Sequence, residues 1–218
     1  MSAQKERAGQ TPQKPKRGGR PSKSDAERLQ TVILDTAEKM FLSKGFGDTS
    51  IEAIAAAAGT AKKTIYARFG SKEGLFIAVD ERILAKPDKR SISAEGSFEE
   101  RLVATSLAML SRMLQPKLVR IYSIVTGEAQ RFPDLARRGE YATAFPARRA
   151  LRELLAQGHE SGEIIVDDLQ RATELLETMV NMAPLNWTIL GVKKMDSAAQ
   201  EDWVRSAVAL FLHGCKRR

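Results

Sequence analysis

The sequence predicts an all-α fold. Strong helix formers, above all Ala, Leu, Glu and Arg, are its commonest residues. Apolar residues recur at spacings of three and four, which places them on one face of a helix. A long alternation of apolar and polar residues, the pattern of a half-buried strand, is absent from the sequence. Glycine and proline separate the successive helical patterns, so we expect many helices of ordinary length.

Composition and charge argue against a membrane-spanning or disulfide-bonded protein and favour one that binds nucleic acid. The sequence holds no apolar run of membrane-spanning length, and its one cysteine, Cys215, excludes an intramolecular disulfide. We therefore expect a cytoplasmic protein. The net charge is +8; residues 1–24 hold seven basic side chains and one acidic, whereas residues 25–86 hold nine of each. The excess lies in a basic arm, and such an arm favours a nucleic-acid partner.

Residues 1–23 are predicted to be a disordered basic arm because they lack large apolar side chains. Within them, the segment 16–21 (KRGGRP) resembles the core of an AT-hook, in which Arg17 and Arg20 would lie along a narrow minor groove. The second glycine departs from that pattern. A solvated linker is the alternative interpretation of the arm.

The first helix is predicted from Ser24 to Lys44. Ser24 and Glu27 form the pattern of a capping box at its start. One face of the helix is apolar at helical spacing, through Leu29, Val32, Ile33, Thr36, Ala37, Met40 and Phe41. Gly45 and Gly47 end the helix, with Phe46 between them turned back onto the core.

The next two helices are short and meet at a glycine. The first is predicted over Ser50–Ala58, with Thr49 and Glu52 as a capping box. Gly59 ends it, because glycine takes a left-handed conformation without strain. The second begins at Ala61 or Lys62 and ends at Phe69, with Ile65 and Phe69 facing the core.

Two short helices of this kind form the pattern of a helix-turn-helix. The first helix is lined with alanines, which allow close packing, and the second presents lysines and an arginine. An ordinary helical hairpin with solvated lysines is the alternative. A fourth helix is predicted from Lys72 to about Ala85, capped by Ser71.

This region resembles the N-terminal domain of the TetR family of transcriptional regulators. The resemblance is carried by Ile33–Phe41, Lys44–Phe46, Thr49–Ile51, Ile54–Ala55, Ala58–Gly59 and Thr64–Leu75. It implies an all-α homodimer with a three-helix helix-turn-helix domain at residues 24–86. It also implies a larger helical domain at residues 87–218 for ligand binding and dimerisation. The partners it implies are double-stranded DNA with a roughly palindromic operator and an unknown small-molecule effector.

The chain departs from the family pattern inside the recognition helix. Ala61 stands where serine often caps that helix, which leaves Thr60 as the alternative cap. Lys63 stands where glycine or alanine is common, and Arg68 where histidine or asparagine is common. Extra cations at these positions can contact phosphates or guanine edges.

The expected DNA contacts follow from position in the helix-turn-helix. Lys62, Lys63 and Thr64 lie at the front of the recognition helix, where base edges are reached. The family resemblance assigns Tyr66 and Lys72 to backbone phosphates. The complete set of expected contacts is Arg17, Arg20, Thr49, Ser50, Lys62, Lys63, Thr64, Tyr66, Arg68 and Lys72.

Residues 87–218 are predicted to form further helices. The predicted ranges are Ser97–Leu114, Lys117–Arg131, 134–158, Asp167–Leu190 and Ser197–Cys215, separated by glycines and prolines. The C-terminal part resembles the AefR-like ligand-binding domain of TetR regulators. The resemblance is carried by Ile121, Tyr122, Val125 and Glu128–Leu135, by the arginine-rich helix that follows, and by the connection between Gly158 and Gly162. The residues expected around the effector are Met109, Met113, Tyr122, Val125, Phe145, Met179, Met182 and Trp187. Ordinary core packing is the alternative for each of them.

The last two predicted helices are more apolar than one core requires, which favours a four-helix interface across a two-fold axis. Catalysis is not expected: His159 and His213 have no neighbours at metal-ligand spacing, and no cofactor or metal is implied. The sequence therefore predicts a ligand-responsive homodimeric repressor. The alternatives are an architectural DNA binder governed by the arm and a helical enzyme that carries this N-terminal domain.

Overall fold

The computed structural model describes residues 23–85, 96–133 and 146–215, and these residues form helices and connections without a strand. The all-α prediction is confirmed. Arg17, Arg20 and Phe145 lie outside the described residues. The helices are α1 Lys23–Lys44, α2 Ile51–Ala57, α3 Lys62–Phe69, α4 Lys72–Leu84, α5 Phe98–Met113, α6 Pro116–Glu128, α8 Pro146–Glu160, α9 Leu169–Ile189 and α10 Ser197–Cys215.

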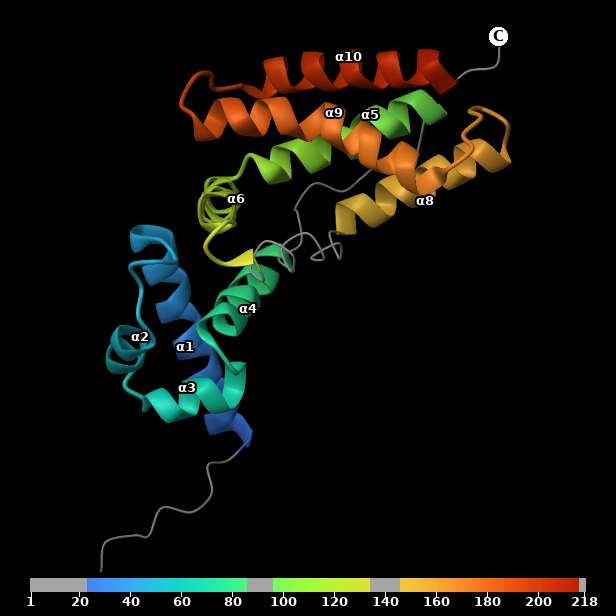
Figure 1. Cartoon of the computed structure of the whole chain (residues 1–218). Coiled ribbons are helices and arrows are strands. Elements are labelled where there is room, and N and C mark those ends of the chain that lie inside the picture. The colour runs from blue at the N-terminus through green and yellow to red at the C-terminus, as the bar shows by residue number, and fades with distance from the viewer. Residues whose placement is uncertain (1–22, 86–95, 134–145, 216–218) are drawn as a thin grey trace, which may run out of the picture.

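The molecule is elongated, with α1–α4 at one end and a bundle of α5, α8, α9 and α10 at the other (Figure 1). Helix α6 lies between the two ends. No helix among the described residues combines the length and apolar character that crossing a membrane requires.

The N-terminal end is built on three phenylalanine rings. Phe41 from α1, Phe46 from the following loop and Phe76 from α4 lie with ring centroids 5.2–5.8 Å apart, in stacked and edge-on pairs. Around them pack the fully buried Ile54 of α2 and Ile65 of α3. The predicted inner faces of these helices, including the position of Phe46, are confirmed except at Val32 of α1, which is 45% exposed.

The start of α2 differs from the prediction. Ser50 is the N-cap, and its hydroxyl accepts the N–H of Ala53 at 3.1 Å. The hydroxyl of Thr49 instead donates to the carbonyl of Gly45 at 2.7 Å, and the residue is buried. The capping box at Thr49 is therefore wrong, because this side chain closes the loop that follows α1.

The turn between α2 and α3 confirms the role of Gly59, which has a φ of +63°. Helix α3 begins directly after Ala61, which serves as N-cap without a side-chain hydrogen bond. Thr60 is thus not the cap, and its N–H completes the end of α2 by donating to Ala55 at 2.9 Å.

Helix α4 begins at the predicted residue, with the hydroxyl of Ser71 accepting the N–H of Gly74 at 3.0 Å. Gly74 has no room for a side chain, because a Cβ atom there would lie 2.0 Å from the carbonyl oxygen of Phe69. This close approach fixes the end of α3 against the first turn of α4.

In the C-terminal part, α5, α9 and α10 agree with the predicted ranges to within two residues. Helix α6 begins at Pro116, where a missing N–H costs nothing, and ends three residues before the predicted Arg131. Of the helix predicted over 134–158, the described part runs from Pro146 to Glu160. Ser24 lies inside the first turn of α1, so the helix begins before that predicted cap.

Helix α9 contains an internal proline, Pro184, which cannot donate to the carbonyl of Val180 four residues earlier. The indole N–H of Trp203 in α10 donates to that carbonyl at 3.0 Å. Trp203 also packs edge-on against Trp187, with ring centroids 5.2 Å apart. Pro184 and Trp203 together fix α10 against α9.

Candidate DNA-binding surface and its coupling to the C-terminal helices

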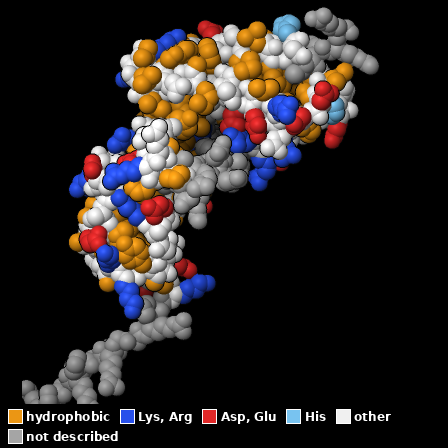
Figure 2. All heavy atoms as spheres, in the orientation of Figure 1, with side chains coloured by type: hydrophobic (Ala, Val, Ile, Leu, Met, Phe, Trp, Pro, Cys, Tyr) orange, Lys and Arg blue, Asp and Glu red, His pale blue; other side chains and the backbone are white. Residues whose placement is uncertain are grey.

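Helix α3 presents its polar side away from the core. Lys62, Lys63 and Arg68 are exposed, and Tyr66 keeps 41% of its surface accessible. Basic side chains gather at the tip of this end of the molecule, over α3 and the start of α1 (Figure 2). The opposite side of α3 is anchored by the fully buried Ile65.

The three cations of α3 have different surroundings. Lys62 forms an ion pair with Glu52 of α2 and lies 5.7 Å from the centre of the Tyr66 ring. Its hydrogen bond lowers the pKa of Glu52 and raises the pKa of Lys62. Within the described residues, neither Lys63 nor Arg68 forms an ion pair. The uncompensated positive charge of α3 therefore lies at Lys63 and Arg68.

Two other residues expected to contact DNA, Thr49 and Lys72, interact with groups inside the protein. Thr49 is 1% exposed, so its side chain does not reach the surface. Lys72 lies over the Phe46 ring at 4.4 Å from its centre and donates to the carbonyl of Gly47 at 3.2 Å. Burial lowers the pKa of Lys72. Ser50 is exposed, while its hydroxyl caps α2.

A buried carboxylate joins the two ends of the molecule. Glu38 of α1 is 8% exposed and accepts from Arg82 of α4 at 2.7 Å and from Lys117 of α6 at 2.5 Å. Arg82 also pairs with Asp35 at 2.8 Å. Burial alone would raise the pKa of Glu38, but the two cations outweigh it and leave that pKa below its ordinary value.

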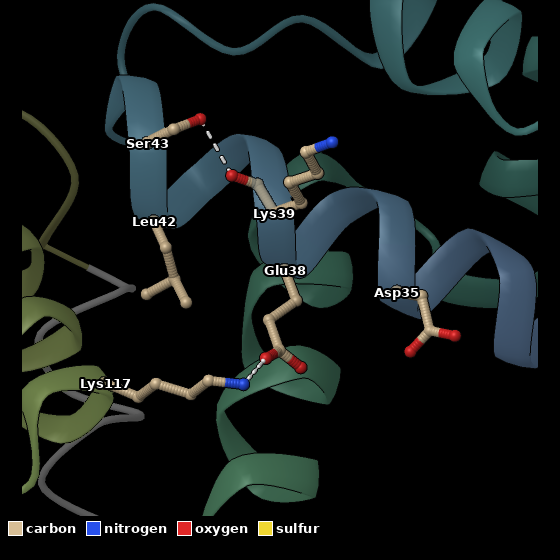
Figure 3. A pocket seen from close by; sticks show the side chains of 6 residues that line it. All are labelled: Asp35, Glu38, Lys39, Leu42, Ser43 and Lys117. Atoms are coloured by element: carbon tan, nitrogen blue, oxygen red, sulfur yellow. Dashed lines mark hydrogen bonds and ion pairs between the residues drawn. The ribbon is translucent and has the colours of Figure 1, made fainter.

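This ion-pair cluster borders a hollow between α1 and α6 (Figure 3). In the close view Lys117 reaches across from α6 to Glu38, while Asp35 and Lys39 line the α1 side. The six lining residues are Asp35, Glu38, Lys39, Leu42, Ser43 and Lys117. Both charge signs are present, so the hollow offers no field that selects one kind of ion.

Three further side chains of α5 and α6 hold backbone groups of the N-terminal helices. Arg112 donates to the carbonyl of Ile83 at the end of α4 at 2.7 Å. Arg120 donates to the carbonyl of Leu42 near the end of α1 at 3.0 Å. The carboxylate of Glu128 accepts the N–H of Gly47 at 3.0 Å. Helix α6 is therefore bonded both to α1 and to the loop that leads into α2.

The residues expected around an effector fall into two places. Met109 is buried in the core of the C-terminal bundle of α5, α8, α9 and α10 (the second core), and Met179 packs against that core. Tyr122 has its hydroxyl 4.0 Å from the sulfur of Met182. Val125 differs, because it packs against the N-terminal core. Met113 and Trp187 are half-buried.

Sequence reasoning missed two buried polar residues. Asn181 of α9 is 3% exposed, and neither its Nδ2 nor its Oδ1 has a hydrogen-bond partner among the described residues. Ser106 of α5 is 0% exposed, and its hydroxyl is also unpartnered within that part of the chain. An unsatisfied buried polar group costs about 1–3 kcal/mol. Both belong to helical patterns that read as apolar, so only their polarity at core positions could have signalled them.

Two family models match the chain. The model described as "Bacterial regulatory proteins, tetR family" covers residues 33–79. The model described as "AefR-like transcriptional repressor, C-terminal domain" covers residues 100–214, which is more than half of the chain. The chain belongs to the TetR family of bacterial transcriptional regulators. Its α2–α3 pair is accordingly the DNA-binding helix-turn-helix of a transcriptional regulator.

Two relatives of this TetR regulator are named as transcriptional repressors. The HTH-type transcriptional repressor ComR of Escherichia coli is 29% identical over 155 residues, which cover 67% of this chain and 70% of ComR. The HTH-type transcriptional repressor NicS of Pseudomonas putida is 45% identical over 60 residues, which cover 28% of each chain.

Solved structures extend the likeness over most of the chain. The flavonoid-responsive regulator FrrA superposes with a TM-score of 0.73 at 28% identity, covering 88% of this chain and 99% of FrrA. A TetR-family regulator from Mesorhizobium loti superposes with a TM-score of 0.70 at 24% identity, covering 88% and 98%. The second likeness concerns the fold alone.

No group of three or more potential metal ligands occurs among the described residues. His159 and His213 lie on different helices, α8 and α10.

Proposed function

We propose that this protein is a homodimeric repressor that binds a roughly palindromic operator and is released by a small molecule. The observation that carries the DNA-binding part is the asymmetry of α3. Its core side is fixed by Ile65, and its exposed side carries two cations without an ion pair in the described parts of the chain, Lys63 and Arg68. ComR and NicS, which are named as repressors, support the sign of regulation.

In the proposed complex, α3 enters the major groove with Lys63 and Thr64 at base edges. Lys62 exchanges Glu52 for the DNA, while Tyr66 and Arg68 contact the flanking phosphates. Ser50 contacts a phosphate beside the start of α2. The proposal omits Thr49, which is buried. Lys72 acts indirectly by holding Phe46 and Gly47 in place.

Dimerisation is proposed through α9 and α10. Leu175 on α9 and Leu210 on α10 are 56% and 68% exposed, although both lie on otherwise well-packed helices. A second copy would remove these side chains from water, which favours association. The two α3 helices of such a dimer would face successive major grooves about 34–36 Å apart.

The proposed effector binds beside the second core, where α6 meets α5 and α9. The structurally similar FrrA is named a flavonoid-responsive regulator, which supports a small-molecule response in this chain. Helix α6 would carry the response, because Lys117, Arg120 and Glu128 bond it to the N-terminal helices. An effector that prefers one position of α6 would then select one spacing of the two α3 helices.

The experiment is footprinting of the purified protein on DNA, including the region upstream of its own gene. Protection of two half-sites about one helical turn apart is the expected result. Equal binding to all sequences, or no protection at modest salt, would contradict the proposal.

A further inference from the structure

The side-chain amide of Asn181 is buried without a hydrogen-bond partner among the described residues. It lies 3% exposed on α9, directly after Val180, which is fully buried in the second core. Its Nδ2 and Oδ1 both lack a hydrogen-bond partner among the residues that the structure describes. Buried polar groups in folded proteins are nearly always paired, so an amide with both ends free is an exception that requires a reason.

Asn181 lies beside the point where Pro184 interrupts the hydrogen bonding of α9. Pro184 removes one helical hydrogen bond from α9, and Trp203 satisfies the carbonyl of Val180 that is thereby freed. The described helices thus supply a donor for the backbone beside Asn181 and none for the side chain. In this segment of α9, the freed carbonyl of Val180 is therefore hydrogen-bonded, whereas the side-chain amide of the adjacent Asn181 is not.

Two neighbouring helices contribute further polar groups with weak or no partners in the described part of the chain. Ser106 of α5 is fully buried, and its hydroxyl is unpartnered there. The hydroxyl of Tyr122 on α6 has as its described partner only the sulfur of Met182, at 4.0 Å, and Met182 follows Asn181 in the chain. Thioether sulfur is a weak acceptor, so this hydroxyl is free to change partner.

No charged side chain is buried among the described residues of the C-terminal helices. The buried polar side chains described for the C-terminal helices are all neutral: Thr105, Ser106, Thr173 and Asn181. Glu177, one turn before Asn181, is paired with Arg148 at 2.5 Å. Adaptable apolar side chains come from Met109 and Met179. An ionised ligand would lose its hydration here without gaining a counter-charge.

We propose that the side-chain amide of Asn181 recognises the effector by hydrogen bonding, and that this effector is an uncharged molecule with an apolar body and a hydroxyl, carbonyl or amide group. The inference rests on the proposed function, in which a small molecule binds among α5, α6 and α9. Ser106 supplies a second hydrogen bond. An amide both donates and accepts, so it selects polar uncharged groups against hydrocarbon and against carboxylate.

The test compares Asn181→Leu with Asn186→Leu in the full-length protein. Asn186 lies on the same helix but is exposed, which makes it the matched control. Because leucine matches the amide in size and needs no hydrogen bond, Asn181→Leu is expected to keep or raise the melting temperature relative to the control. A melting temperature clearly below that of Asn186→Leu would show that the protein satisfies the amide, and would overturn the proposal.

The second arm measures the binding of two sets of probes, each with an unsubstituted, a hydroxylated and a carboxylated member. The first set is naphthalene, 2-naphthol and 2-naphthoate, and the second set carries the same substituents on flavone. The hydroxylated probe is expected to bind most tightly on at least one body. Asn181→Leu should weaken it by about tenfold, the value of one hydrogen bond, and leave the unsubstituted body within about twofold. Ser106→Ala, which only removes a hydroxyl, should reduce the same preference by less.

Equal binding of hydroxylated and unsubstituted probes, tighter binding of the carboxylates, or no binding of either hydroxylated probe would each overturn the inference. Operator binding by the same preparations separates this failure from failure of the proposed function. A protein that protects an operator but shows no preference for the hydroxylated probes remains a regulator with a different effector chemistry.

Discussion

Asp80 on α4 is a half-buried carboxylate with no cation bound to it among the described residues, and it offers a direct measure of electrostatic cost in this fold. Burial raises its pKa from 3.8 to about 6, and the neighbouring Glu81 adds to the effect. At neutral pH the folded protein therefore carries a charge in an unfavourable place. Replacing the carboxylate by the neutral amide in Asp80→Asn should stabilise the protein.

The magnitude follows from the two pKa values. The interval from 3.8 to about 6 corresponds to about 3 kcal/mol, since one pH unit is worth about 1.4 kcal/mol. Asp80 keeps some access to water, so we expect a gain of about 1–3 kcal/mol at pH 7.5. For a chain of this size that gain raises the melting temperature by roughly 2–12 °C.

The sign of the pH dependence is fixed by the direction of the shift. The folded protein binds the Asp80 proton more tightly than the unfolded chain does, so protonation stabilises the fold. That stabilisation is complete below pH 3.8 and is lost as the pH rises to about 6. The advantage of Asp80→Asn should accordingly be largest above pH 6 and fall to about half at pH 5.

The assay is thermal unfolding at pH 7.5 and pH 5, with Asp167→Asn as the matched control because Asp167 is exposed. Equal melting temperatures of the two variants at pH 7.5 would refute the assignment of an electrostatic cost to Asp80. An advantage that grows as the pH falls would refute the direction of its pKa shift.

Three other predictions concern pairs that the structure brings together. Glu52→Gln removes the partner that Lys62 must leave in order to contact the DNA, so we expect tighter DNA binding, whereas unchanged affinity in a salt titration would leave the pair without influence on DNA. Glu38→Gln should lower the free energy of unfolding in urea by about 3 kcal/mol at pH 7. Because the folded protein lowers the pKa of Glu38, this difference between wild type and variant should shrink as the pH falls below 4.5. A difference that stays constant with pH would contradict the ion pairs as its source. Trp203→Phe leaves the carbonyl of Val180 without its donor, which should cost about 1–3 kcal/mol, and a loss no larger than that of Trp187→Phe would contradict the role assigned to the indole.

Local features of the fold were predictable because they depend on neighbouring residues. The turn at Gly59, the cap at Ser71 and the buried side of α3 at Ile65 each follow from a pattern within a few positions, and each is confirmed. The cap of α2 shows where such patterns fail. Ser50 and Thr49 are both suitable caps, and Ser50 takes the role because the hydroxyl of Thr49 closes the loop at Gly45.

The contacts that join the two ends of the molecule were not predictable from spacing. Lys117 and Glu38 are 79 positions apart, and Glu128 and Gly47 are 81 apart. Exposed and paired lysines look alike in a sequence, so the different surroundings of Lys62 and Lys63 required the structure. Asn181 was missed because one polar residue does not disturb the apolar pattern of a helix.

The central claim is that the exposed side of α3 reads DNA sequence. The most direct measurement is selection of bound sequences from random DNA by the full-length protein, repeated with Lys63→Ala and with Lys39→Ala as an exposed control on α1. We predict an enriched pair of inverted half-sites for the wild type and for Lys39→Ala, with weaker or altered enrichment for Lys63→Ala. Similar affinity for all sequences, or a Lys63→Ala profile identical to that of the wild type, would contradict the account.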